Sequence, residues 1–139
     1  MPLTPDERQS FLAEPHVGAF SVSAGPRRGP LTVPIWYQYE PGGDLWVLTG
    51  AESEKMRRIR EAGRFSLMAE RVAPTVRYVS VEGPVTRVEP MSDEQHRGMA
   101  SRYLPPEQVE DYLSFAEAEF GEQVVVYMHP QRWLSADLG

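Results

Sequence analysis

The segment Thr49-Gly50-Ala51-Glu52-Ser53-Glu54-Lys55 brings two hydroxyls and a lysine close together. It follows the apolar stretch Leu45–Leu48 and precedes a helical pattern, so it predicts a turn between a strand and a helix. Hydroxyl donors, a positive charge and the free amides of a helix N-terminus together suit a phosphate group. The alternative is that Ser53 only caps the helix and Lys55 is solvated. Taken alone, the local pattern favours this commoner arrangement.

Other common chemistries lack their residues in this sequence. There is no cysteine, which excludes thiolate sites and disulfides. There is also no G-x-G-x-x-G or P-loop pattern for nucleotide binding and no G-x-S-x-G motif of a hydrolase nucleophile. His16, His96 and His129 fall on three different expected elements without metal-binding spacing. We therefore expect them at the surface or at caps and expect no metal site. No pair of carboxylates stands out as an acid and a base, so no catalytic residue is assigned.

The composition supports a single domain over residues 1–139. The chain is 41% hydrophobic and 24% charged, and its length allows one core. The formal net charge of −6 argues against a nucleic-acid or anionic-membrane surface. The apolar runs are far shorter than the roughly 20 residues of a membrane span, and the acidic start of the chain does not resemble a signal peptide. We therefore expect a cytoplasmic protein.

Caps and breakers mark four helices. Thr4, Pro5 and Glu7 form a capping box that opens the first helix, and Ser92 and Gln95 repeat its spacing. Glycine or proline ends or interrupts the later helices. The helices are expected at 4–13, 53–62, 92–103 and 106–120. In the second helix the inward face is Met56 and Ile59, and the residues expected in solvent are Arg57, Arg58 and Arg60.

Alternating apolar and polar residues predict the strands. Pro34 cannot donate to a sheet ladder, so its side of the strand must be an edge, a bulge or a place where something other than a strand approaches. Gly83-Pro84 inside the longest strand predicts a bend of the kind that barrels use. The fold class is therefore α+β, a six-stranded antiparallel barrel with peripheral helices. The strands are expected at 17–24, 31–39, 45–49, 64–70, 76–88 and 123–129, followed by a tail at 130–137.

The order of these elements resembles the pyridoxamine 5'-phosphate oxidase-like family of FMN-binding split barrels. The run Pro30-Leu31-Thr32-Val33-Pro34-Ile35-Trp36-Tyr37 and the spacing of Thr49, Ser53 and Lys55 also carry this resemblance, which covers nearly the whole chain. It implies that Thr49, Ser53 and Lys55 grip the phosphate of FMN. The family has a basic residue at the position of Glu54, so Arg57 or Arg58 would have to compensate for its absence here.

The resemblance also implies where the flavin ring and a second subunit lie. Backbone groups around Pro34, Ile35 and Trp36 would meet the edge of the isoalloxazine ring, and Trp36 would cover the ring by stacking. Members of the family are homodimers whose two cofactors lie at the interface. Four further residues would then reach the partner's flavin: Arg77, Tyr78, Ser80 and Trp133.

The resemblance points away from a true pyridoxamine phosphate oxidase. Those enzymes carry an arginine and a lysine where this chain has Val33 and Gln38, and an Arg-x-His signature where it has Trp133-Leu134-Ser135. The implied activity is that of a homodimeric flavin-dependent oxidoreductase. Hydride would pass between the cofactor and a small, largely apolar or aromatic substrate, beneath a lid formed by the helices between Met91 and Phe120.

Three alternatives concern the cofactor. The deazaflavin coenzyme F-420 could replace FMN if Arg27-Arg28 and Arg57-Arg58-Arg60 formed a basic groove for its acidic tail, although the net negative charge favours FMN. The same barrel could hold a flavin, haem or tetrapyrrole without turnover. It could also be a barrel that has lost its cofactor, because Glu54 weakens the phosphate grip.

Overall fold

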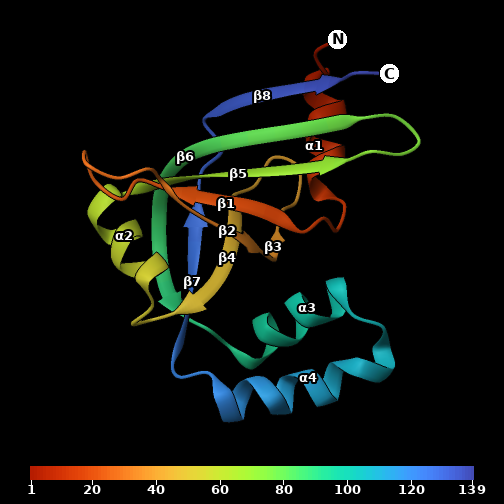
Figure 1. Ribbon diagram of the computed structural model, residues 1–139. Coiled ribbons are helices and arrows are strands. Elements are labelled where there is room, and N and C mark those ends of the chain that lie inside the picture. Colours follow the sequence, from red (N-terminus) through yellow and green to blue (C-terminus); the bar gives the residue numbers. More distant parts are fainter.

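An antiparallel sheet curls through the centre of the molecule (Figure 1), in a computed structural model that describes residues 1–139. The strands follow the order β2-β1-β5-β6-β7-β4-β3, and β8 pairs with β6 outside this path. Their bounds are β1 Gly18–Val22, β2 Leu31–Ile35, β3 Tyr37–Gln38, β4 Leu45–Gly50, β5 Arg64–Arg71, β6 Arg77–Pro90, β7 Gln123–Met128 and β8 Arg132–Asp137. The predicted α+β class and split antiparallel barrel are confirmed, with eight strands in place of six.

One extra strand arises because the expected strand over 31–39 divides at Trp36. Residues 31–35 pair with β1, whereas residues 37–38 pair with β4 at the opposite end of the sheet. The prediction of one continuous strand is therefore wrong: the chain changes its partner strand at this point. Pro34 lies in β2, which is an edge strand, so its missing N–H leaves no inner ladder incomplete. Of the three arrangements that the sequence allowed at Pro34, the structure shows the edge.

The second extra strand comes from the tail at 130–137, where no strand was predicted. It forms β8 because the first half of β6 has a free side, where Arg77 to Glu82 pair with Asp137 to Arg132. The second half of β6 pairs with β7, and the register shifts between Val85 and Arg87. The bend predicted at Gly83-Pro84 is confirmed. A Cβ at Gly83 would overlap the carbonyl oxygen of His129, so the glycine lets the chain cross the bend on its way to β8.

All four expected helices are present: α1 Pro5–Ala13, α2 Glu54–Ala62, α3 Asp93–Tyr103 and α4 Pro106–Glu119. Both predicted capping boxes form, at Thr4 and at Ser92. Gly63 ends α2 with a φ of 73°, a left-handed conformation that favours glycine. α3 and α4 form a hairpin on one side of the sheet, away from β8 and the two termini (Figure 1). None of the helices has the length and apolar character needed to span a bilayer.

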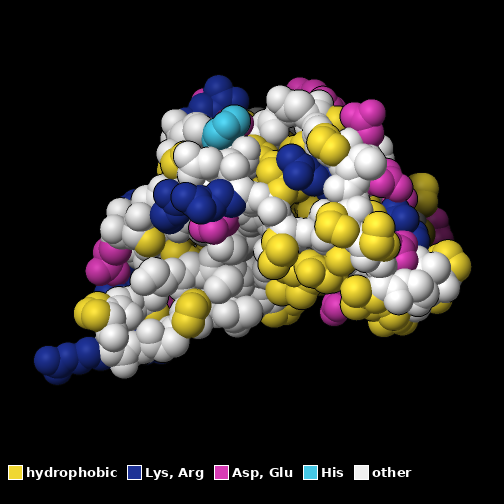
Figure 2. All heavy atoms as spheres, turned by 90° about the horizontal axis from the view of Figure 1, so that it is seen from above, with side chains coloured by type: hydrophobic (Ala, Val, Ile, Leu, Met, Phe, Trp, Pro, Cys, Tyr) yellow, Lys and Arg dark blue, Asp and Glu magenta, His cyan; other side chains and the backbone are white.

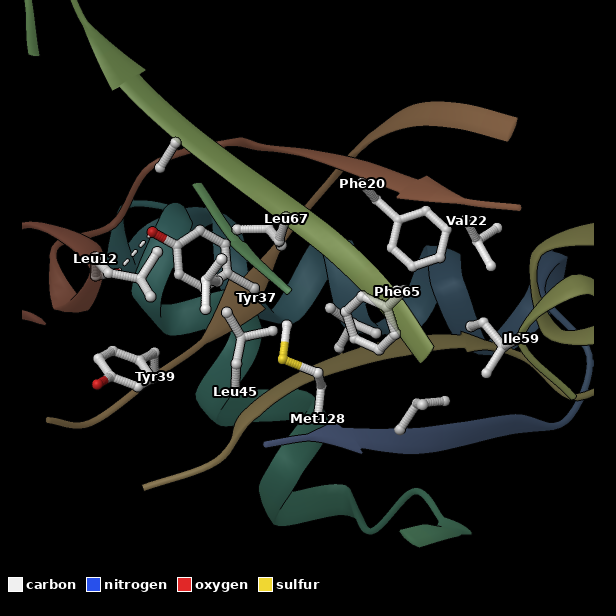
Figure 3. Packing of buried hydrophobic residues seen from close by; sticks show 14 of the residues in the cluster. Leu12, Phe20, Val22, Tyr37, Tyr39, Leu45, Ile59, Phe65, Leu67 and Met128 are labelled. Atoms are coloured by element: carbon white, nitrogen blue, oxygen red, sulfur yellow. Dashed lines mark hydrogen bonds between the residues drawn. The ribbon is translucent and has the colours of Figure 1, made fainter. Parts of the chain in front are cut away.

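The core lies inside the curled sheet (Figure 3). Phe20 and Leu67 pack there from β1 and β5, and α2 adds Met56 and Ile59, as predicted. Tyr37 is completely buried, and its hydroxyl donates a hydrogen bond of 2.7 Å to the carbonyl of Leu12. Burial raises the pKa of this phenol well above its usual value, so the hydroxyl stays protonated and its bond ties α1 to β3.

Candidate functional site

A cleft of about 610 Å³ opens between the sheet and the α3–α4 hairpin. Its sheet side consists of the β2–β3 junction, the end of β4 and the start of α2. Its helical side consists of α3, α4 and the segment that leads into β7. This volume lies in the range of sites for cofactors and drug-sized ligands. Six of the predicted site residues line it: Pro34, Ile35, Trp36, Thr49, Ser53 and Lys55.

The turn between β4 and α2 has the donors that an anion needs. Ser53 Oγ accepts a hydrogen bond of 3.1 Å from the Met56 amide and lies 2.9 Å from Thr49 Oγ1. Ser53 is therefore a helix cap, as the simpler interpretation of the sequence held, and it also lines the cleft. The amides of Glu54 and Lys55 make no hydrogen bond within the chain, because they belong to the first turn of α2.

Lys55 lines the cleft, whereas the arginines nearby are held by carboxylates. Glu54 accepts a hydrogen bond of 2.7 Å from Arg57 and one of 2.8 Å from Arg58. These contacts, with that from Arg57 the larger, hold the pKa of Glu54 below its usual value. Arg58 was expected in solvent, but only 15% of its side chain is exposed because it packs along the helix between Glu54 and Glu61. Neither arginine lines the cleft.

A row of four aromatic rings connects the β2–β3 junction to the helical side of the site. Trp36 stacks on Tyr103 with ring centroids 4.9 Å apart and an angle of 9° between the planes. Tyr112 lies 5.3 Å from Trp36, and His96 meets Tyr112 edge to face at 6.0 Å. Trp36, Tyr112 and His96 line the cleft. Tyr103 thus covers one face of the Trp36 indole, and the expected stacking of Trp36 on a flavin stays a prediction.

Tyr103 also completes the hydrogen bonding where the barrel splits. Its hydroxyl accepts from the Tyr37 amide at 3.1 Å and lies 2.7 Å from the carbonyl of His16, to which it donates. A strand that changes its partner leaves backbone groups without a ladder, and such groups are costly to bury unpaired. The α3 side chain therefore substitutes for a neighbouring strand and fixes α3 against the β2–β3 junction.

The sequence interpretation missed the contribution of α3 and α4 to the lining. His96 was expected at the surface or at a cap, but the structure places it partly buried in the cleft, where burial lowers its pKa. Met99 and Ala100 follow on the same helix face and also line the cleft. Their i, i+3, i+4 spacing in the sequence was the available signal, but it marks a covered helix face without saying what covers it.

Four predicted residues lie outside the cleft of their own chain. Arg77 donates a hydrogen bond of 2.9 Å to Asp137, and the Arg8 guanidinium lies 4.7 Å from the ring centroid of Trp133. Tyr78 and Ser80 lie in the part of β6 that pairs with β8. Their expected contact with the cofactor of a partner subunit stays a prediction.

Comparison with known proteins adds a family and several similar folds. The family described as Pyridoxamine 5'-phosphate oxidase matches residues 4–136. A solved structure described as an F420 reductase has a TM-score of 0.71 at 18% identity, over 91% of this chain and 94% of that chain. A FAD-binding protein from Mesorhizobium loti has a TM-score of 0.66 at 16% identity, over 100% and 98% of the two chains.

A heme binding protein from Mycobacterium smegmatis has a TM-score of 0.59 at 16% identity, over 99% of this chain and 59% of that chain. The curated proteins include no match. At such low identities the structural likenesses show the shared fold. The family match covers almost the whole described fold, from the cap of α1 to the end of β8. The chain therefore belongs to the pyridoxamine 5'-phosphate oxidase-like family of split barrels.

Proposed function

We propose that the protein is a flavin-dependent oxidoreductase that binds FMN in the cleft. The observation that carries this proposal is the position of Lys55, the only lysine of the chain, beside two hydroxyls and two unbonded helix amides at the lining of the cleft. A bound flavin would supply hydride transfer. Lys55 and the turn would hold its phosphate, the β2–β3 junction would orient its ring, and α3 and α4 would exclude water.

FMN suits the site better than a deazaflavin with an acidic tail. The basic groove that such a tail needs would draw on Arg57 and Arg58, but both are paired with Glu54 and Glu61. Arg27 and Arg28 lie on the exposed loop between β1 and β2 and do not line the cleft. One available lysine matches one phosphate group. The spectrum and the mass of the chromophore released from purified protein would distinguish the two cofactors.

The phosphate site is tested by Lys55→Ala. A charge-assisted hydrogen bond contributes about 1.5–3 kcal/mol, so we expect FMN to bind roughly ten- to hundredfold more weakly. Quenching of FMN fluorescence during titration measures the affinity. Arg28→Ala is the matched control, because Arg28 is exposed on the loop between β1 and β2, outside the cleft. Equal affinities of Lys55→Ala and the control would contradict the phosphate assignment.

We further propose that the active form is a homodimer. Seen from the side of β8, hydrophobic side chains gather on one part of the surface (Figure 2). The exposed hydrophobic residues of β8 and the β5–β6 connection include Leu134, at 65% exposure, and Val72, at 77%. Arg77, Tyr78, Ser80 and Trp133 belong to this same part of the sheet. They can meet a cofactor only if a second copy presents its own cleft to them.

Sedimentation of Leu134→Glu tests the dimer. A carboxylate in an apolar interface is strongly disfavoured, so we expect wild-type dimers and a variant that is mainly monomeric. Flavin affinity should fall together with dimer formation. Val88→Glu, which also replaces an exposed apolar residue but lies in the other half of β6, should remain dimeric. A monomeric wild-type protein that binds FMN fully would refute the shared site.

Haem binding without turnover is a second candidate, and the position of His96 favours it. The imidazole lines the cleft and makes no hydrogen bond within the chain, and neutral imidazole is a common ligand of haem iron. Addition of haemin should then produce a shifted Soret band that His96→Ala abolishes. Oxidation of reduced flavin that is accelerated by an added acceptor would instead support the enzyme.

A further inference from the structure

The helical side of the cleft is apolar except for a few groups. Met99 and Ala100 are buried, and Phe120 lies at its edge with 44% exposure. The polar side chains on this side are His96, Tyr112, Glu119 and Gln123. The side chains of His96 and Tyr112 make no hydrogen bond within the chain, although both are partly buried. His96 and Tyr112, which lie beside the apolar residues of this wall, thus have their hydrogen-bonding capacity free.

The two groups are held in place by packing. Tyr112 lies between Trp36, at 5.3 Å, and His96, at 6.0 Å, and Trp36 is itself stacked on Tyr103. The hydroxyl of Tyr103 is fixed by backbone groups of β3 and of the chain before β1. The orientation of the Tyr112 and His96 rings is therefore set before any ligand binds, which lowers the entropy lost on binding.

We propose that His96 and Tyr112 form a hydrogen-bonding subsite that takes the carbonyl oxygen of a planar, uncharged, apolar ligand. A neutral imidazole and a phenol each offer one donor, and a carbonyl oxygen has two lone pairs to accept them. Lowering of the His96 pKa by burial keeps the imidazole neutral near pH 7, and raising of the Tyr112 pKa by burial keeps the phenol protonated. This inference rests on the proposed function: it names the substrate class of the same cleft.

The ligand class follows from what surrounds the pair. Trp36, Met99 and Phe120 present aromatic and apolar surface, which suits a flat hydrophobic body. Glu119 also lines the cleft and disfavours an anionic substrate. Lys55 would not be available to neutralise such a substrate, because the phosphate of the cofactor requires it. A ketone or aldehyde on an aromatic ring system has a flat apolar body, carries no negative charge and supplies the carbonyl oxygen that His96 and Tyr112 would bind.

The experiment compares two ligands that differ only at one group, 2-acetylnaphthalene and 2-ethylnaphthalene, in the FMN-loaded protein. Equilibrium dialysis measures both affinities in the wild type, Tyr112→Phe and His96→Leu. We expect the ketone to bind about three- to tenfold more weakly to each variant, because a neutral hydrogen bond is lost, while the hydrocarbon is not weakened. Tyr127→Phe is the control, since that hydroxyl pairs with Gln95 outside the cleft. It should change neither affinity.

Each result decides the proposal. A selective loss for the ketone supports it, whereas equal changes for both ligands, or none, overturn it. Weaker FMN binding in Tyr112→Phe with unchanged ketone affinity would assign the pair to the cofactor and also overturn it.

If the wild type does not bind FMN, the dialysis is done on the protein without flavin. A selective effect of Tyr112→Phe there would uphold the subsite while the proposed function fails. Tyr112→Phe keeps the packed ring, whereas His96→Leu changes the packing, and thermal melts verify that both variants are folded.

Discussion

Two adjacent residues of opposite charge, Glu54 and Lys55, control the electrostatics at the start of α2. Lys55 lines the cleft, whereas Glu54 is paired with Arg57 and Arg58. A carboxylate in the first turn interacts favourably with the helix dipole, so Glu54 stabilises α2. The same negative charge reduces the positive potential available to an anion at this turn. Helix stability and anion binding therefore make opposite demands on position 54.

Glu54→Gln should strengthen FMN binding. The substitution removes a negative charge beside the phosphate site and releases Arg57 and Arg58 from their carboxylate partner. Exposed charge interactions are weak, so the expected gain is roughly two- to fivefold in affinity. Fluorescence titration at low and high salt measures it, and the gain should shrink as the salt concentration rises.

Glu61→Gln is the control for this prediction. Glu61 contacts the same two arginines but lies at the other end of α2. It should leave the affinity nearly unchanged, because its charge is farther from the turn. A loss of affinity in Glu54→Gln would show that the carboxylate positions the turn rather than opposing the phosphate.

The strand β6 depends on the absence of a side chain at Gly83. Its two halves belong to different parts of the sheet, and the chain between β7 and β8 crosses it at Gly83. The amide of Gln131 donates to the Glu82 carbonyl at 2.9 Å, and the amide of His129 donates to the Pro84 carbonyl at 3.0 Å. This close backbone approach allows one strand to serve both halves of the split barrel.

Gly83→Ala should destabilise the protein strongly. The added methyl group would overlap the backbone of His129, which cannot move without breaking the hydrogen bonds on either side. We expect the free energy of unfolding to fall by about 3 kcal/mol or more, as measured by urea denaturation.

Gly98→Ala tests whether that loss is specific to the crossing. Gly98 lies inside α3, where a Cβ would meet no atom within 4 Å. Alanine should therefore stabilise α3 by about 0.4–1 kcal/mol. Similar losses in the two variants would contradict the explanation from close approach.

The two ends of the chain meet and hold the upper part of the barrel together (Figure 1). The amide of Asp137 donates to the Met1 carbonyl at 2.9 Å. Asp137 Oδ2 accepts from Thr75 at 2.8 Å and from Arg77 at 2.9 Å. Hydrogen bonds from Gly139, Thr75 and Arg77 lower the pKa of Asp137 to about 2. The carboxylate of Asp137 thus connects β8 to the β5–β6 connection and the start of β6, and its backbone connects β8 to the N-terminus.

Asp137→Asn should lower the melting temperature at neutral pH. Because the folded state lowers the pKa of this carboxyl from 3.8 to about 2, its stabilisation is present above about pH 4 and is lost as the pH falls toward 2. The difference in melting temperature between wild type and variant should therefore disappear over that range. Calorimetry at a series of pH values measures this. Asp111→Asn, on an exposed part of α4, is the control and should change little. A difference that persists at pH 2 would contradict the assignment to this carboxylate.

Much of the fold was predictable because its signals are local. The capping boxes at Thr4 and Ser92, the glycine that ends α2 and the alternation within the strands involve residues a few positions apart. The division of the strand at Trp36 and the pairing of β8 were not predictable. Both depend on which distant strand offers a free edge, and alternation within a segment is the same whichever neighbour it finds.

The candidate site likewise has one part that local sequence signals predict and one part that depends on distant contacts. The amino-acid sequence alone identifies the Thr49, Ser53 and Lys55 turn, since a strand, a helix start and their polar residues are consecutive in the chain. The aromatic row of Trp36, Tyr112 and His96, which connects the β2–β3 junction to the helical side, exists only in the folded molecule. Those rings come from separate elements. They meet because Tyr103 packs against the β2–β3 junction and holds the α3–α4 hairpin beside it.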